Sequence, residues 1–172
     1  MCASCSSSES ATAVSTASTT RVTVEPSTPT SQQVERCTAN DLTATAEPGT
    51  DSAMGNTKLI IDVTNSSDRP CVLPTTPPTL AGVRPDGEHV PLVSKGAETY
   101  FGTPPPFDGP LEVGGMAVVW VGSLWPDACP PANETATWSS MLLGLPDGST
   151  TPFMTPFDTK CGIDVSNFST PR

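Results

Sequence analysis

Apolar and polar residues alternate with a period of two along much of the chain, a pattern typical of β-strands. The clearest example lies between residues 58 and 64, where Leu59, Ile61 and Val63 occupy every second position. Because successive side chains of a strand point to opposite faces, this pattern predicts a strand with one fully buried face. Residues 116–121 form a continuous apolar run that is too short to span a membrane. That run predicts a fully buried strand.

Turn signals separate the apolar runs. Residues 80–83 and 89–93 flank Pro85-Asp86-Gly87, which predicts a hairpin, and residues 146–148 repeat the same signal. Pro48-Gly49 predicts a further turn, and a single helical turn is expected near Thr38. No long segment has helical periodicity. About eight short strands with almost no helix predict an all-β fold, an antiparallel two-sheet β-sandwich of immunoglobulin-like architecture.

Composition divides the chain into two parts. Residues 1–36 contain no aromatic residue and consist mainly of Ser, Thr and Ala. Such a segment buries too little apolar surface to offset the loss of chain entropy on folding, so we expect a disordered tether. Residues 37–172 carry all the aromatic residues and are expected to form the β-sandwich domain, with Trp120 and Trp138 in its core.

Cys5 lies near the N-terminus, after Ala3 and Ser4 and before a run of serines. This arrangement is similar to the lipidation site of a bacterial lipoprotein, in which a cysteine carries a diacylglycerol and a polar stalk follows. No apolar export segment precedes Cys5 in the sequence. Two alternatives remain open: an inert pair of cysteines, or a redox or metal-binding Cys-x-x-Cys motif formed with Cys2.

The chain is acidic, with a net charge of −10 over its 172 residues. Residues 37–172 hold six basic and fifteen acidic groups, so almost all of this charge belongs to the predicted domain. A negative surface repels phosphate backbones and anionic lipid headgroups. We therefore expect no nucleic-acid partner, and membrane attachment only through a lipid on Cys5.

Four further cysteines are isolated from one another: Cys37, Cys71, Cys129 and Cys161. Metal sites place their cysteines in close pairs, whereas this spacing favours disulfides. Disulfides imply an oxidising compartment, so we expect an extracytoplasmic protein. Four cysteines allow three connectivities, which the spacing leaves open.

Catalytic motifs are missing from the sequence. His89 is the only histidine, follows a turn signal and has no Gly-x-Ser-x-Gly motif to serve. The acidic residues lack the spacing of a calcium loop. We expect no catalytic residues, no bound metal and no cofactor.

The segment 94–110 is rich in proline and contains Tyr100, Phe101 and Phe107. Three consecutive prolines exclude a central strand and favour an extended loop. Aromatic residues on a preformed loop are good contact residues, so these three form a candidate binding loop. Packing into the core is the alternative for each of them.

The order of these features resembles the actinobacterial secreted and lipoprotein domain of unknown function numbered 4232. The resemblance covers residues 36–166 and rests on the segments Glu35-Arg-Cys37-Thr-Ala-Asn-Asp-Leu42, Val63-Thr-Asn-Ser-Ser-Asp-Arg-Pro-Cys71-Val-Leu73 and Gly109-Pro-Leu-Glu-Val-Gly-Gly115, with two later cysteines. It implies a β-sandwich at the cell envelope with no catalytic residues. It also implies cysteines paired in chain order, Cys37 with Cys71 and Cys129 with Cys161. The chain departs from the family in residues 74–78 and in its Pro-rich 94–110 segment.

Together these features predict a non-enzymatic β-sandwich lipoprotein of the cell envelope that binds a protein or small ligand through its Pro-rich, aromatic loops. Two other functions are kept as alternatives. One is a structural spacer of the envelope, and the other is a hydrolase that uses a pair of Asp or Glu side chains brought together by folding.

Overall fold

The structure, a computed structural model, describes residues 34–53, 56–92, 94, 99, 101–123, 138–154 and 163–171. All of them belong to the unit Gln33–Arg172. The elements in chain order are the 3₁₀ turn η1 (Ala39–Asp41) and the strands β1 (Leu42–Ala53), β2 (Asn56–Asn65), β3 (Thr79–Val83), β4 (His89–Leu92), β5 (Met116–Ser123), β6 (Ser140–Gly144), β7 (Thr150–Phe153) and β8 (Ile163–Val165). The part of the chain that the structure describes contains no helix that is long and apolar enough to cross a membrane.

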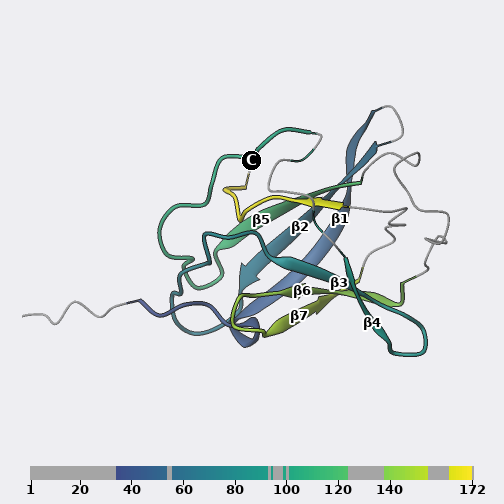
Figure 1. Ribbon diagram of the computed structural model, residues 1–172. Coiled ribbons are helices and arrows are strands. Elements are labelled where there is room, and N and C mark those ends of the chain that lie inside the picture. Colours follow the sequence, from purple (N-terminus) through teal and green to yellow (C-terminus); the bar gives the residue numbers. More distant parts are fainter. Residues whose placement is uncertain are drawn as a thin grey trace, which may run out of the picture. The chain divides into compact units, whose positions relative to one another are not determined.

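The strands form two antiparallel sheets of four strands each (Figure 1). One sheet has the order β1-β2-β5-β8 and the other the order β4-β3-β6-β7. Both sheets contribute to a single hydrophobic core, which confirms the predicted β-sandwich. The predicted hairpin is also present, because Leu80 pairs with Leu92 and Val83 with His89 around the turn at Pro85-Asp86-Gly87.

Strands β2 and β5 form the centre of the first sheet, as their hydrophobic patterns predict. Ile61 pairs with Val119, and Val63 pairs with Ala117. All four side chains are fully buried in the core. Water is excluded from these inner-face side chains because they pack in the core that both sheets share. This sheet supports the candidate site described below.

The turn expected at Pro48-Gly49 was wrong, because β1 continues through these residues to Ala53. Pro48 still pairs with Leu59 of β2, and the register shifts between Pro48 and Ser52. β1 is the edge strand of its sheet, where a residue without an N–H group costs no ladder hydrogen bond. A bulge absorbs the irregularity that the sequence suggested was a turn.

The tryptophans occupy different places from those expected. Trp120 is buried, but it lies on the outer face of the first sheet, because its neighbours Val119 and Val121 fill the inner face. The Lys58 ammonium lies 3.3 Å from the centroid of its ring. Trp138 is only half-buried and lies over Gly82, where an added Cβ would come within 2.3 Å of the indole.

A disulfide joins Cys37 to Cys71 across a sequence separation of 34 residues. This confirms one of the two bonds that the family resemblance implies. Both cysteines are buried at the end of the core. Cys129 and Cys161 lie outside the described residues, so their pairing stays a prediction.

Candidate functional site

The disulfide fixes an extended segment that begins at Cys71. The Cys37 N–H donates to the Val72 carbonyl at 3.0 Å, and the Val72 N–H donates to the Glu35 carbonyl at 2.8 Å. On the other side, Cys71 and Leu111 exchange two backbone hydrogen bonds, of 3.2 and 2.7 Å. Residues 71–72 are therefore held between two neighbouring segments, and the chain continues from there to Leu73, Pro74 and Thr75.

Asn65 locks this arrangement from the end of β2. Its side-chain amide is buried and donates to the carbonyls of Arg69 and Leu111, both at 2.9 Å. Its Oδ1 accepts from the Ser67 N–H at 3.0 Å and from the Ser67 hydroxyl at 2.7 Å. The Asn65 backbone also exchanges hydrogen bonds with the turn at residues 114–115. One side chain thus ties the turn after β2 to the segment that leads into β5.

A second segment is attached to the opposite edge of β5 through the C-terminal residues. Val118 and Ser169 exchange two backbone hydrogen bonds of 2.9 Å, and the Ser166 N–H donates to the Trp120 carbonyl at 2.9 Å. The Phe107 N–H in turn donates to the Phe168 carbonyl at 2.9 Å. The Pro-rich segment is therefore held against the sheet by the C-terminal segment.

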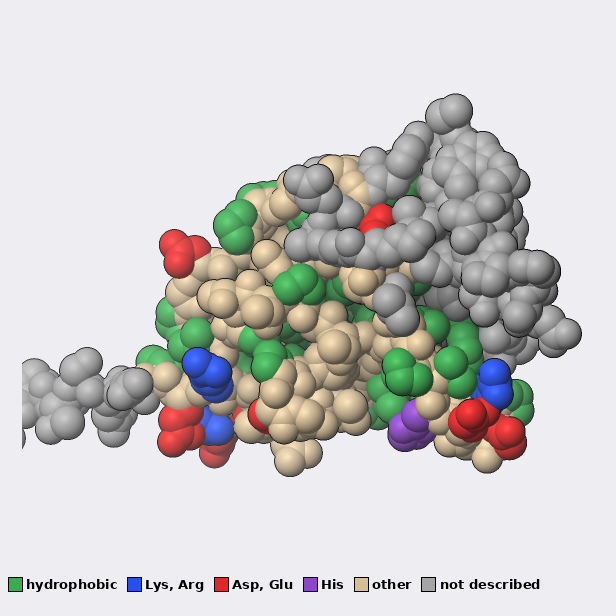
Figure 2. All heavy atoms as spheres, viewed as in Figure 1, with side chains coloured by type: hydrophobic (Ala, Val, Ile, Leu, Met, Phe, Trp, Pro, Cys, Tyr) green, Lys and Arg blue, Asp and Glu red, His purple; other side chains and the backbone are tan. Residues whose placement is uncertain are grey.

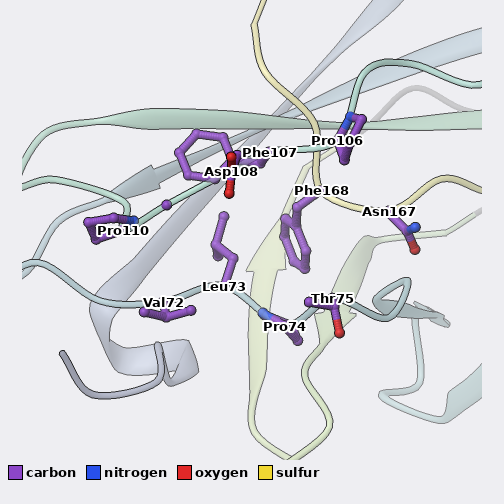
Figure 3. A pocket seen from close by; sticks show the side chains of 11 residues that line it. Val72, Leu73, Pro74, Thr75, Pro106, Phe107, Asp108, Pro110, Asn167 and Phe168 are labelled. Atoms are coloured by element: carbon purple, nitrogen blue, oxygen red, sulfur yellow. The ribbon is translucent and has the colours of Figure 1, made fainter. Parts of the chain in front are cut away.

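A groove lies between these two attached segments (Figure 3). Its volume is about 300 Å³, and its walls come from three stretches of the chain: Val72, Leu73, Pro74 and Thr75; Pro106, Phe107, Asp108, Gly109 and Pro110; and Asn167 and Phe168. In Figure 3, Leu73 points from its segment toward Phe107 and Asp108. Leu73 and Phe168 belong to the buried core, so the bottom of the groove is continuous with it.

The groove is mostly apolar. Among the residues that line it, Asp108 is the only ionisable one. On the face shown in Figure 2, charged side chains gather near the β3–β4 hairpin and near the start of β1, and the surface between them is largely uncharged. Within the described part of the chain, no three His, Cys, Asp or Glu side chains are placed to hold a metal ion. The lining can therefore contact an apolar group and supply a single negative charge.

Two of the three aromatic residues predicted to form one binding loop, Phe101 and Phe107, are described by the structure, and they contact different parts of the domain. Phe107 lines the groove and also packs against the core. Phe101 lies elsewhere, with the buried Lys58 ammonium 6.0 Å from its ring centroid. Tyr100 lies outside the described residues, as does the proposed lipidation residue Cys5. Of the two described aromatic residues of the predicted loop, Phe107 lines the groove and Phe101 does not.

Sequence reasoning missed the other two stretches that line the groove. Residues 72–75 directly follow a cysteine and contain a proline, a local signal for an extended segment near a cross-link. Nothing in the sequence near Asn167 and Phe168 indicates that they meet residues 106–110. Residues 106–110 and 167–168 are brought together by the pairing of Ser169 with Val118 and Pro106 and by the hydrogen bond from the Phe107 N–H to the Phe168 carbonyl.

The acidic residues do not converge on the groove in the described structure, apart from Asp108. Asp62 lies on the outer face of β2, where burial and, to a lesser degree, the charge of Glu47 raise its pKa. Neither carboxyl lines the groove. His89 lies exposed at the start of β4. The arrangement that would favour a hydrolase, two carboxyls facing a cleft, is not formed by these residues.

Asp41 is the most strongly held carboxylate near the disulfide. Its Oδ2 accepts from the Thr38 N–H and from the Thr38 hydroxyl, both at 2.8 Å. Its Oδ1 lies 3.5 Å from the Arg69 guanidinium, which also pairs with Glu35. The Thr38 backbone hydrogen bond, helped by the Thr38 hydroxyl and Arg69, lowers the pKa of Asp41 despite its burial. These contacts hold the turn after β2 against η1.

The family model described as Domain of unknown function (DUF4232) matches residues 37–171. The chain belongs to this family. The match begins at the first cysteine of the Cys37–Cys71 disulfide and ends just beyond the C-terminal residues that line the groove, so both structural features lie within the DUF4232 domain. No match is found among the curated proteins or among the solved structures.

Replacing Asn65 with Ala should destabilise the domain by about 2–4 kcal/mol, because the four side-chain hydrogen bonds of Asn65 to Ser67, Arg69 and Leu111 are lost. Urea unfolding followed by tryptophan fluorescence measures this loss. Ser67→Ala removes only one hydroxyl from the same turn and should cost about 1 kcal/mol. A stability of Asn65→Ala within about 0.5 kcal/mol of the unaltered protein would show that the Asn65 contacts do not hold the turn.

Asp41→Asn should destabilise the protein by about 1 kcal/mol at neutral pH, since it removes a charged acceptor from the start of η1. Because the folded-state pKa of Asp41 is lowered, its contribution is fully present above the ordinary value of 3.8 and is lost as the pH falls through the folded-state pKa. Urea unfolding of both proteins across this pH range measures the difference in free energy.

Asp62→Asn is the control, because the pH dependence of its stability relative to the unaltered protein should have the opposite sign. The raised pKa of Asp62 means that the unaltered protein gains stability relative to this variant as the pH falls through the folded-state pKa. Parallel pH profiles for Asp41→Asn and the unaltered protein would contradict the assignment for Asp41.

Proposed function

We propose that this DUF4232 protein is a non-enzymatic binding module of the cell envelope, and that the groove between residues 72–75 and 106–110 is its binding site. The observation that carries the proposal is the way in which the groove is built. Its walls are loops, yet backbone hydrogen bonds hold both walls to the sandwich, and the disulfide also holds the wall at residues 72–75. A preformed, mostly apolar concavity with few polar groups is typical of ligand-binding sites.

The lining also supports a binding role over a catalytic one. Asp108 is the only carboxylate in it, and Thr75 contributes the only hydroxyl. The lining contains no His, Lys, Cys or Ser, and its single carboxylate is one short of the pair that glycoside hydrolysis uses. Contact with an apolar group requires no such pair.

Binding is tested with the full chain labelled with ¹⁵N and a neutral blocked pentapeptide that carries a central leucine. We expect chemical-shift changes at the amides of Leu73, Thr75, Phe107 and Asp108. Thr75→Arg places a long side chain at the exposed rim and should abolish these changes. Thr43→Arg, a matched change at an exposed position of β1, should leave them intact.

Shift changes that are absent, or that fall away from the groove, would contradict the proposal and favour a structural spacer. Changes that persist in Thr75→Arg would place the binding surface elsewhere. The two variants should unfold at similar temperatures, since both positions are exposed.

The proposed location at the envelope depends on a lipid attached to Cys5. Cys5 is followed by a long polar segment that would separate a membrane anchor from the β-sandwich. A single acyl anchor gives only marginal binding, whereas a diacylglycerol provides the two chains that stable attachment needs. The oxidising compartment that this location implies agrees with the Cys37–Cys71 disulfide.

Cys5→Ser should move the protein, expressed in its native cells, from the membrane fraction to the soluble fraction. Cys2→Ser is the matched control and should stay in the membrane fraction. Intact-mass analysis of the membrane-bound protein measures the added lipid directly. Equal fractionation of both variants, with no lipid mass, would contradict lipidation at Cys5.

A further inference from the structure

The hydrogen-bonding character of the groove is unbalanced. Three of its lining residues are prolines, Pro74, Pro106 and Pro110, which have no N–H to donate. The polar side chains that line it are those of Thr75, Asp108 and Asn167. Since a carboxylate only accepts hydrogen bonds, the groove offers more acceptors than donors.

Asn167 carries an acceptor that no protein group uses. Its Oδ1 is buried and accepts no hydrogen bond, the only side-chain oxygen or nitrogen of this kind among the described residues. Its backbone carbonyl is satisfied by the hydroxyls of Ser166 and Ser169, at 2.8 and 3.0 Å. Because this oxygen is also closed off from solvent, a ligand in the groove does not reach it.

The charge of the lining is negative, so it favours the same kind of ligand as the excess of acceptors does, one that carries hydrogen-bond donors. Asp108 is exposed and supplies the only charge in the lining. Arg36 pairs with Val72 through the backbone but does not line the groove. The domain as a whole is acidic, with six basic and fifteen acidic groups in residues 37–172. A cationic ligand is therefore attracted both by the domain and by the groove.

The size of the groove favours part of a polypeptide over a larger small molecule. A volume of about 300 Å³ is at the lower end of the range for ligand pockets. Val72, one of the lining residues, is 37% exposed, so the apolar surface of the lining continues to the rim of the groove. An apolar side chain can enter the groove while the neighbouring residues of its chain contact this rim.

We propose that the groove recognises an extended segment of a partner protein in which an apolar side chain stands next to Lys or Arg. The apolar side chain contacts Leu73, Phe107 and Phe168, and the basic group pairs with Asp108. This inference rests on the proposed binding function of the groove and adds the chemistry of its ligand.

The test compares three blocked pentapeptides that carry Leu followed by Lys, Gln or Glu, titrated into the full chain and followed by NMR. We expect the Lys peptide to bind about two- to fivefold more tightly than the Gln peptide, the range for an exposed ion pair, and the Glu peptide to bind most weakly. Asp108→Asn should remove the difference between Lys and Gln. Asp86→Asn makes the same charge change at the β3–β4 turn and should preserve it.

The outcomes separate the two proposals. Equal affinities of the Lys and Gln peptides would overturn the proposed ligand chemistry and leave binding in the groove intact. Binding of isobutylamine as tight as that of the Lys peptide would overturn recognition of a polypeptide. The absence of shift changes with every peptide would overturn the binding function itself.

Discussion

The hydrogen bonds of the buried Asn65 side chain are the constraint on which the structure at the disulfide end of the domain depends. It stands at the last position of β2 and uses its donors and its acceptor at once, tying the following turn to the segment that enters β5. A buried amide is stable only when its hydrogen bonds are made. The Asn65 amide therefore fixes the position of the turn relative to the segment at Leu111. The Cys37–Cys71 disulfide then holds the segment before η1 against the end of this turn.

This arrangement explains how loops can form a fixed groove. In the chain-entropy model a cross-link across 34 residues contributes roughly 3–4 kcal/mol, comparable with the whole net stability of a small domain. The opposite wall has no described covalent link and depends on backbone pairing of the Pro-rich segment with the C-terminal residues. One wall is therefore held by covalent and side-chain bonds, and the other by extension of the sheet.

A cluster of one lysine and two aromatic residues lies on the outer face of the first sheet. Lys58 is buried with its ammonium over Trp120, and Phe101 lies on the same cation. Aromatic faces attract a lysine ammonium and replace part of its hydration, which offsets part of the cost of burying it. The aromatic residues of the Pro-rich segment thus divide between two tasks. Phe101 contacts this cluster, and Phe107 lines the groove.

Local pattern was enough to predict the strands, the hairpin at residues 85–87 and the sandwich. Alternation in residues 58–64 reports directly which side chains face the core, because the geometry of one strand imposes a period of two. The family resemblance added the Cys37–Cys71 pairing, which the spacing of four cysteines left open. The errors came where sheet context overrides a local signal. Pro48 is tolerated at an edge strand, and Trp120 faces outward because Val119 and Val121 fill the inner face.

The groove itself could not be predicted from local signals. Phe107 was identified because aromatic residues among prolines are unusual, but its partners near residues 72–75 and 167–168 are distant in sequence. They meet because Cys71 pairs with Leu111 and Ser169 pairs with both Val118 and Pro106. Composition and periodicity describe each segment by itself, and so they determined the β-sandwich. The groove depends on long-range pairing between segments that carry no signal of one another, and for that reason it emerged only from the folded structure.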